Sequence, residues 1–218
     1  MQAPATTHSP RRRVVVTLDA PELLTRLFEL EHGSQVIDGI ASASQAVSSV
    51  PRATYYVHDG GHILIVRRGL PAVVHSELEA LEPQRAITAP GLVASILEQH
   101  GPCEEVYSRT VHVFTHVPDV DGPVARSQDG RWCVQVDGQI VSEAWSAAEN
   151  ELAASVRVDT LRAFRGRGLA GNVVAAWVHQ ILESGRTPFY THAIDNHASA
   201  ALARKLGAVE IARGVKCL

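Results

Sequence analysis

A loop rich in glycine and arginine is the feature that most constrains the fold of this chain. The loop, RAFRGRGLAG, covers residues 162–171. It follows the β-type run ELAASVRVDTL (151–161) and precedes LAGNVVAAWVHQILESG (169–185), in which apolar residues recur at helical spacing. A glycine turn from a strand into a helix leaves free amide groups at the helix N-terminus, where the helix dipole also favours negative charge. The sequence therefore predicts a site for a diphosphate or a similar anion.

The residue types within the loop agree with this prediction. Gly166 and Gly168 let the backbone approach a ligand closely, and Arg165 and Arg167 add charges that suit phosphate. The letters GRGLAG also satisfy the dinucleotide-binding pattern G-x-G-x-x-G, but the preceding segment belongs to a hairpin and the required acidic residue is missing. No Gly-Lys-Ser/Thr follows, so the loop is not a P-loop. A basic surface turn is the alternative interpretation.

The second half of the chain predicts the element order β-β-β-α-β-α-β. GRWCVQVDGQIVSEAWS (130–146) indicates a hairpin with its turn at Asp137-Gly138, and 151–161 indicates a third strand. After the loop and its helix we expect a strand over 187–194, a helix over 195–207 capped by Asp195 or Asn196, and a strand over 208–218.

The first half predicts a separate α/β region. Its expected elements are a strand RVVVTL (13–18), a helix PELLTRLFELEHG (21–33), a hairpin turning at Asp59-Gly60-Gly61, a helix TAPGLVASILEQHG (88–101) and a strand EEVYSRTVHVFTHV (104–117). The segment PDVDGPVARSQDG (118–130) is the best boundary. We therefore predict a disordered tail over 1–12, an N-terminal α/β region over 13–120 and a second domain over 121–218.

Composition excludes several classes of protein. The 218 residues carry a net charge of −3, which argues against extensive contact with nucleic acid; we interpret the local run Arg11–Arg13 as a solvated tail. We expect no signal peptide, membrane span or metal site. Three cysteines, Cys103, Cys133 and Cys217, lack metal spacing and predict reduced thiols in a cytoplasmic protein.

The segment from Thr160 to Ala170 resembles the acyl-CoA loop of the GNAT superfamily of N-acyltransferases, whose pattern is Arg/Gln-x-x-Gly-x-Gly/Ala. Downstream, the strand, Asn196, Ser199, Leu202 and the terminal RKLG (204–207) also agree with that family, and GRTPFYTHAIDNHASAALARKLGA looks like a bacterial subgroup. The resemblance covers about residues 130–212. It implies a GNAT fold, a mixed and strongly twisted sheet flanked by helices, with the N-terminal half either a degenerate copy of that fold or a cap.

The resemblance also implies the cofactor site. Acetyl-CoA or another acyl-CoA would lie between two splayed strands, with its pantetheine along Val158 to Thr160. Its pantetheine would also contact Asn196, and Ser199 is a further predicted cofactor-binding residue. Its diphosphate would lie on the amides of six consecutive residues. The six are Arg165, Gly166, Arg167, Gly168, Leu169 and Ala170.

The catalytic groups are less clearly indicated. At the position of the family's thiolate-protonating tyrosine stands Ala203, and at the position of its glutamate base stands Ser155. Transfer to an amine still needs a proton acceptor, and we name Glu143 and His192 as candidates, with Glu151, Asp159 and Tyr190 as further titratable groups. An outward-facing strand glutamate and a satisfied buried histidine are the respective alternatives.

The sequence thus predicts a cytoplasmic enzyme, monomeric or homodimeric, that moves an acyl group from CoA directly to the primary amine of a small molecule. Two alternatives stay open. A GNAT-fold transferase could take its donor from aminoacyl-tRNA or a carrier, which would be the one route to nucleic-acid contact. A protein of this fold could also bind acyl-CoA without catalysis.

Overall fold

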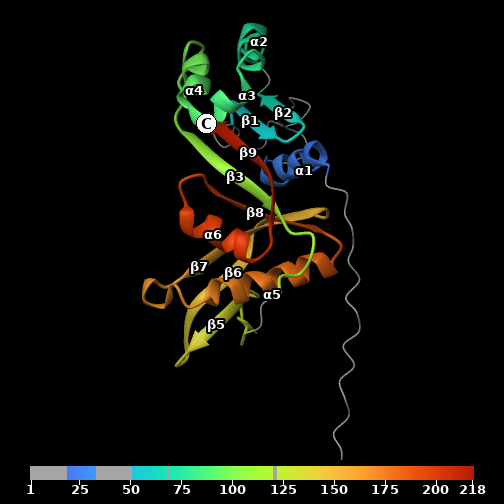
Figure 1. Ribbon diagram of the computed structural model, residues 1–218, viewed down its shortest axis with the longest axis vertical. Coiled ribbons are helices and arrows are strands. Elements are labelled where there is room, and N and C mark those ends of the chain that lie inside the picture. Colours follow the sequence, from blue (N-terminus) through green and yellow to red (C-terminus); the bar gives the residue numbers. More distant parts are fainter. Residues whose placement is uncertain (1–18, 33–50, 68, 120–121) are drawn as a thin grey trace, which may run out of the picture.

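The computed structural model describes residues 19–32, 51–67, 69–119 and 122–218 (Figure 1). The helices are α1 (Ala20–His32), α2 (Ala72–Glu79), α3 (Pro83–Thr88), α4 (Gly91–Glu98), α5 (Leu169–Glu183) and α6 (His197–Lys205), with a 3₁₀ turn over Arg162–Phe164. The strands are β1 (Ala53–His58), β2 (Gly61–Val66), β3 (Val106–Val113), β4 (Ala125–Arg126), β5 (Trp132–Val136), β6 (Gln139–Glu149), β7 (Ala153–Thr160), β8 (Thr187–Ala193) and β9 (Val209–Cys217).

All described strands join one mixed sheet in the order β2-β1-β9-β3-β8-β7-β6-β5-β4. Every neighbouring pair is antiparallel except β7 and β8, which are parallel. Strand β3, from the first half of the chain, lies between β8 and β9 from the second half. The fold is therefore the mixed α/β sheet flanked by helices that the sequence predicts. The domain boundary at 120/121 stays a prediction.

The two faces of the sheet carry different helices. Helix α1 places Leu24 and Leu27 on one face, against Phe189, Ile211 and other buried residues. Helices α5 and α6 pack on the opposite face, and α2–α4 extend that layer over β1 and β9. Since side chains alternate between the faces of a strand, the register assigns each strand residue to the α1 face or to the α5/α6 face.

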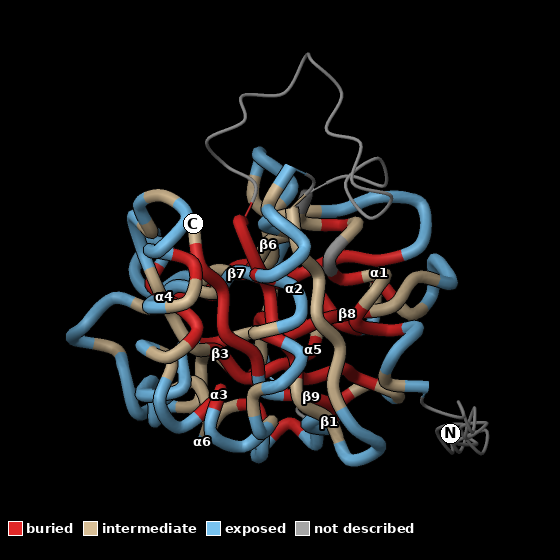
Figure 2. Tube along the Cα trace, turned by 90° about the horizontal axis from the view of Figure 1, so that it is seen from above, coloured by how far each residue is buried: buried red, intermediate tan, exposed pale blue. Residues whose placement is uncertain are grey.

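The hydrophobic core explains why the elements of the second half could be predicted from its sequence. Val173, Val174, Trp177, Val178 and Ile181 of α5 are all buried against the sheet, as their helical spacing predicts. Figure 2 shows that the buried segments concentrate in the central strands, while most connecting loops are exposed. Burial of one large apolar side chain contributes about 1.5–3 kcal/mol, so this row accounts for a substantial part of the stability of the domain.

Most predicted elements are present, with shifts at their ends. The hairpin turn at Asp137-Gly138 has positive φ at both residues (50° and 80°), as a tight hairpin turn requires. Helices α2 and α3 were not predicted; the carboxylate of Glu82 caps α3 by accepting hydrogen bonds from the amides of Gln84 and Arg85. The tail 1–12 and the predicted strand 13–18 lie outside the described residues.

The prediction of reduced thiols is wrong for Cys103 and Cys217 and is confirmed for Cys133. Cys103 and Cys217 form a disulfide, with their Cα atoms 6.1 Å apart, and Cys217 is fully buried. Backbone hydrogen bonds from Glu104 to Leu218 and from Leu218 to Glu105 hold the two segments side by side. Sequence could not show this pairing, because the two cysteines are 114 residues apart. Cys133 is free and buried.

Candidate active site

Strands β7 and β8 separate after a short stretch of pairing. They pair only at Ala153–Ser155 with Thr187–Phe189. Beyond that point β7 stays paired with β6 as far as Thr160, whereas β8 stays paired with β3 as far as Ala193. The facing edges of the two strands, residues 156–160 and 190–193, therefore have no described strand between them. The sheet is opened at this point.

The glycine- and arginine-rich loop begins where β7 ends. Gly166 and Gly168 adopt φ of 77° and 81°, which favours glycine, and Gly168 is the N-cap of α5. The amides of Gly171 and Asn172 bond back to the Gly168 carbonyl. Among the described residues, none accepts a hydrogen bond from the amides of residues 166–170. The predicted anion site thus has a row of available donors at a helix N-terminus.

Three cations surround this row of amides. Arg165 Nε donates to the Thr160 carbonyl at 3.1 Å, and Arg167 Nη2 donates to the Ala163 carbonyl at 3.2 Å. Lys205, at the end of α6, places its ammonium 3.8 Å from where a side chain on Gly168 would begin. The sequence analysis missed Lys205. Lys205 lies near Gly168 because the C-terminal end of α6 packs close to the N-terminus of α5.

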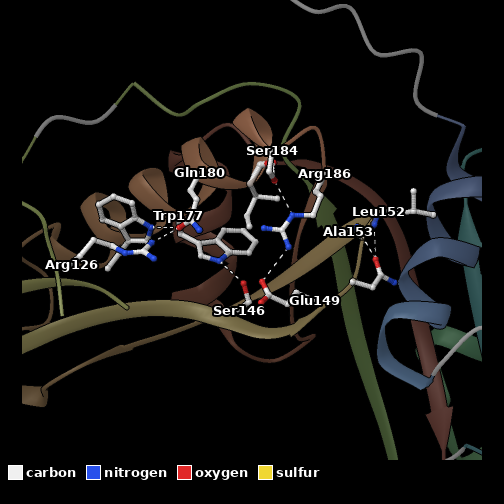
Figure 3. Close-up of polar contacts among 12 residues, drawn as sticks. Arg126, Ser146, Glu149, Leu152, Ala153, Trp177, Gln180, Ser184 and Arg186 are labelled. Carbon is white, nitrogen blue, oxygen red and sulfur yellow. Dashed lines mark hydrogen bonds and ion pairs between the residues drawn. The ribbon is translucent and has the colours of Figure 1, made fainter. Parts of the chain in front are cut away.

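Side-chain hydrogen bonds hold α5 against the sheet, as Figure 3 shows. Trp177 Nε1 donates to Ser146 Oγ at 3.1 Å, and Gln180 Oε1 accepts from Trp132 Nε1 at 2.8 Å and from Arg126 Nη1 at 2.5 Å. At the C-terminal end of the helix, Arg186 Nη1 donates to Glu149 at 3.2 Å. These contacts fix the direction in which the helix N-terminus points.

The other predicted cofactor residues lie on the same face as α5 and α6. Val158 packs against the α5 core, and Thr160 Oγ1 shares a hydrogen bond of 2.8 Å with Ser142 Oγ. Asn196 caps α6 by accepting from the Ser199 amide at 3.0 Å, as the sequence predicts. The fold therefore collects the predicted residues around the opening between β7 and β8. Their contact with a cofactor stays a prediction.

His192 lies on β8 beside this opening, three residues after the last pair with β7. Its side chain shares the α5/α6 face with Tyr190, which packs against α5 and α6. The residue is 8% exposed; Nδ1 bonds to the Ala193 carbonyl at 2.8 Å, and Nε2 has no partner among the described residues. The bond to a carbonyl assigns the ring proton to Nδ1. Nε2 is therefore left as a buried proton acceptor.

Glu143 lies on the opposite face. It pairs in register with Cys133 and Asp159, one residue away from Ala144, which faces α5. Its Oε1 accepts from Arg131 Nη1 at 3.2 Å, and it is half-buried. The structure therefore does not bring Glu143 and His192 together. Each stands on its own side of the opened sheet.

The two positions that depart from the family pattern are both buried. Ala203 lies on α6 and is fully buried in the core, and Ser155 is 7% exposed at the last β7–β8 pair. Tyr190 lies in the same core cluster as Ala203. Burial raises the pKa of the Tyr190 phenol, and a hydrogen bond with Ser199 acts in the opposite direction. Glu151 and Asp159 are exposed.

Two properties bear on the expected partners. Among the described helices, none is long and apolar enough to cross a membrane. The described residues also contain no group of three or more His, Cys, Asp or Glu side chains that could hold a metal ion.

Comparison with known structures finds only distant likeness. A GCN5-related N-acetyltransferase from Kribbella flavida matches with a TM-score of 0.49 and 18% identity over 88% of this chain and 94% of its own. A GCN5-related N-acetyltransferase-like protein from Streptococcus suis matches with a TM-score of 0.46 and 17% identity, over 91% of this chain and 100% of its own. A protein of the GNAT family from Novosphingobium aromaticivorans matches with 0.46 and 19%, over 53% of this chain and 65% of that one. Values this low carry no argument about function.

Comparison by sequence is more specific. Among curated proteins, none matches this chain. The family model for GNAT acetyltransferases matches residues 130–211, which contain β5–β8, the loop, α5, α6 and the start of β9. This part of the chain, from the second hairpin to the last strand, is therefore similar in sequence to GNAT acetyltransferases.

Proposed function

We propose that residues 121–218 bind an acyl-CoA, with acetyl-CoA as the first choice, and transfer its acyl group to the primary amine of a small molecule. The observation that carries the proposal is the opening between β7 and β8, which lies beside a row of free amides at the start of α5. The similarity of the matched residues to GNAT acetyltransferases supports the same reaction class. Location in the cytoplasm and a monomeric or homodimeric state stay predictions.

The residues present fit such a donor. The amides of residues 166–170 suit a diphosphate, and Arg165, Arg167 and Lys205 would balance its charge. The unpaired edge of β7 beyond Ser155 offers backbone groups to the amides of a pantetheine, much as a strand pairs with its neighbour. Asn196 and Ser199 border the same face.

The reaction needs one proton acceptor in this arrangement. The neutral amine attacks the thioester carbon, an N–C bond forms, and the C–S bond breaks with the electron pair leaving on sulfur. The nitrogen then gives up a proton, and the thiolate takes one, so that the products are an amide and a free thiol. We assign the removal of the amine proton to Nε2 of His192, the buried and unpartnered ring nitrogen beside the opening.

The acceptor would enter the opening between β7 and β8 from the α1 face, so that its amine reaches His192 through the opening. Glu143 and Asp159 lie directly opposite each other on β6 and β7, and two like charges in such a pair destabilise a sheet. Trp145 lies on the same face, with the guanidinium groups of Arg131 and Arg157 at 4.4 and 5.9 Å from its ring centre. A cationic amine would suit the two carboxylates, and this assignment gives Glu143 a role in acceptor binding.

Calorimetric titration with acetyl-CoA, free CoA and adenosine diphosphate tests the donor site. We expect binding near one to one, weakened about 100-fold or more by Arg165→Glu and by Gly168→Asp, since each places a carboxylate against the diphosphate at a loss of roughly 3 kcal/mol. Arg85→Glu in α3 is the matched charge reversal at the far end of the molecule, and its binding should equal that of wild type (Figure 1). Undiminished binding by both loop variants would rule out this site.

Turnover measurements with a panel of amines test His192. We expect His192→Ala to lower kcat by about 10²–10⁴-fold, the usual contribution of a general base, with little change in affinity for the donor. His179→Ala, at an exposed position of α5, is the control and should retain full activity. If His192→Ala turns over as fast as wild type, the base is another group.

Binding without catalysis is a second candidate. It is favoured by Ala203 and Ser155, which put an alanine and a buried serine where the resemblance implies a catalytic tyrosine and glutamate. Tight binding of acetyl-CoA without release of thiol to any amine in the panel would support it over the transferase.

A further inference from the structure

A second buried histidine packs on His192 from the first half of the chain. His112 lies on β3, the strand inserted between β8 and β9. Its ring centre is 5.2 Å from that of His192, and the two rings are inclined by only 28°. His112 is 4% exposed, so both rings are removed from solvent.

Each ring of the stack has one nitrogen without a hydrogen-bond partner among the described residues. In His112 this nitrogen is Nδ1. His192 in turn uses Nδ1 for the Ala193 carbonyl and leaves Nε2 without a partner. A buried polar atom without a partner destabilises the folded state by about 1–3 kcal/mol, so two of them in one stack call for an explanation.

Burial and the groups around His112 together lower its pKa and so favour the neutral ring. Burial, and then the positive charge that His192 acquires on protonation, lower the pKa of His112; Glu210 on β9 and the Tyr190 backbone act in the opposite direction. From β8, Tyr190 meets the His112 ring edge-on. Two adjacent buried imidazoles do not both take a proton readily, so a proton on one ring disfavours a proton on the other.

We propose that His112 is a positioning residue for His192: its unprotonated Nδ1 orients the His192 ring and stabilises the imidazolium that forms when Nε2 takes a proton. This inference rests on the proposed role of His192 as base. It also gives the first half of the chain a part in the reaction, because β3 carries His112 into the second half. The stack, and not His192 alone, is then the proton-accepting unit.

The test is an NMR titration of the histidine rings in wild type, His112→Leu and His112→Asn. Leucine removes the acceptor and leaves an apolar wall, which disfavours the charged form, so the His192 titration midpoint should fall by roughly one pH unit. Asparagine retains an acceptor atom on Cγ, at the position of Nδ1 in histidine. In His112→Asn the His192 titration midpoint should therefore return most of the way to its wild-type value. A packing role alone would leave the midpoint unchanged in both variants, and that result would overturn the proposal.

Kinetics separate this proposal from the proposed function. In His112→Leu the acidic limb of the kcat profile should move to lower pH together with the NMR midpoint, and His112→Asn should move it back. If the NMR midpoint moves while kcat of His192→Ala equals that of wild type, the pairing stands and the assignment of His192 as base fails. His62→Leu, at a half-buried histidine on β2 far along the sheet from β8, is the control that should move neither.

Discussion

Two buried polar clusters lie on opposite faces of the same sheet, and they differ in what they bring together. On the α1 face, Glu31 accepts hydrogen bonds from both Arg109 and Lys216, and Arg109 also donates to the Tyr56 hydroxyl. On the α5/α6 face, His112 and His192 stack, each with one unpartnered ring nitrogen. Opposite charges meet in the first cluster, whereas like groups meet in the second.

The contrast separates a structural use of buried polarity from a chemical one. The Glu31 cluster ties α1 to β1, β3 and β9, where the sheet is continuously paired. The histidine stack lies where β7 and β8 part, and one nitrogen of each ring has no hydrogen-bond partner among the described residues. Arg109 Nε in the Glu31 cluster also lacks a partner among the described residues, but Glu31 balances the charge of that guanidinium, whereas no described carboxylate pairs with either ring of the stack.

The largest expected effect is on the Glu31 cluster. Glu31→Gln leaves two buried cations with a neutral partner, which should lower the free energy of unfolding by about 3–5 kcal/mol. Urea denaturation measures this loss. Glu22→Gln, which breaks the exposed Glu22–Arg26 pair on the same helix, should cost less than about 1 kcal/mol and is the matched control. Equal losses in both variants would remove the contrast between the buried and the exposed pair.

The same cluster predicts how stability depends on pH. Burial alone would raise the pKa of Glu31, but the charges and hydrogen bonds of Arg109 and Lys216 lower it from 4.5 to about 2. Because the folded value lies below the unfolded one, this contribution is present above pH 4.5 and is lost as the pH falls toward 2. Glu31→Gln should therefore flatten the acid side of the stability profile.

The smallest expected effect is on the histidine stack. His112→Leu removes a buried nitrogen without a partner, a gain that offsets the change in packing, so stability should stay within about 1 kcal/mol of wild type or rise. Phe114→Ala, at the neighbouring buried position that meets Tyr190, should instead lose about 3–5 kcal/mol. Thermal unfolding of both variants checks the comparison. A large loss of stability in His112→Leu would show that the histidine stack stabilises the fold.

Much of the second half could be predicted from its sequence because the signals there are local. The helical spacing from Val173 to Ile181, the Asp137-Gly138 turn and the Asn196 cap each act within a few residues, and each appears in the structure. The loop at Gly166 and Gly168 was found in the same way, since positive φ and a helix start are local properties.

The first half offered weaker signals. Helices α2 and α3 are short, and the Glu82 cap that starts α3 lies in a stretch without a long apolar period. The disulfide between Cys103 and Cys217 depends on two strands that meet from opposite ends of the chain. Such pairings cannot be read from local patterns, because any strand could in principle pair with several others.

The sequence by itself determined most elements of the second half, the glycine-rich turn that starts α5 and the similarity of residues 130–211 to GNAT acetyltransferases, because propensity, turn chemistry and motif spacing operate over short distances. The tertiary structure decided which groups meet. Because β3 lies beside β8, His112 stacks on His192. Lys205 lies near Gly168, and Glu143 and His192 lie on opposite faces of the sheet. These encounters follow from strand order and register, which the packing of the whole chain selects and no short segment encodes.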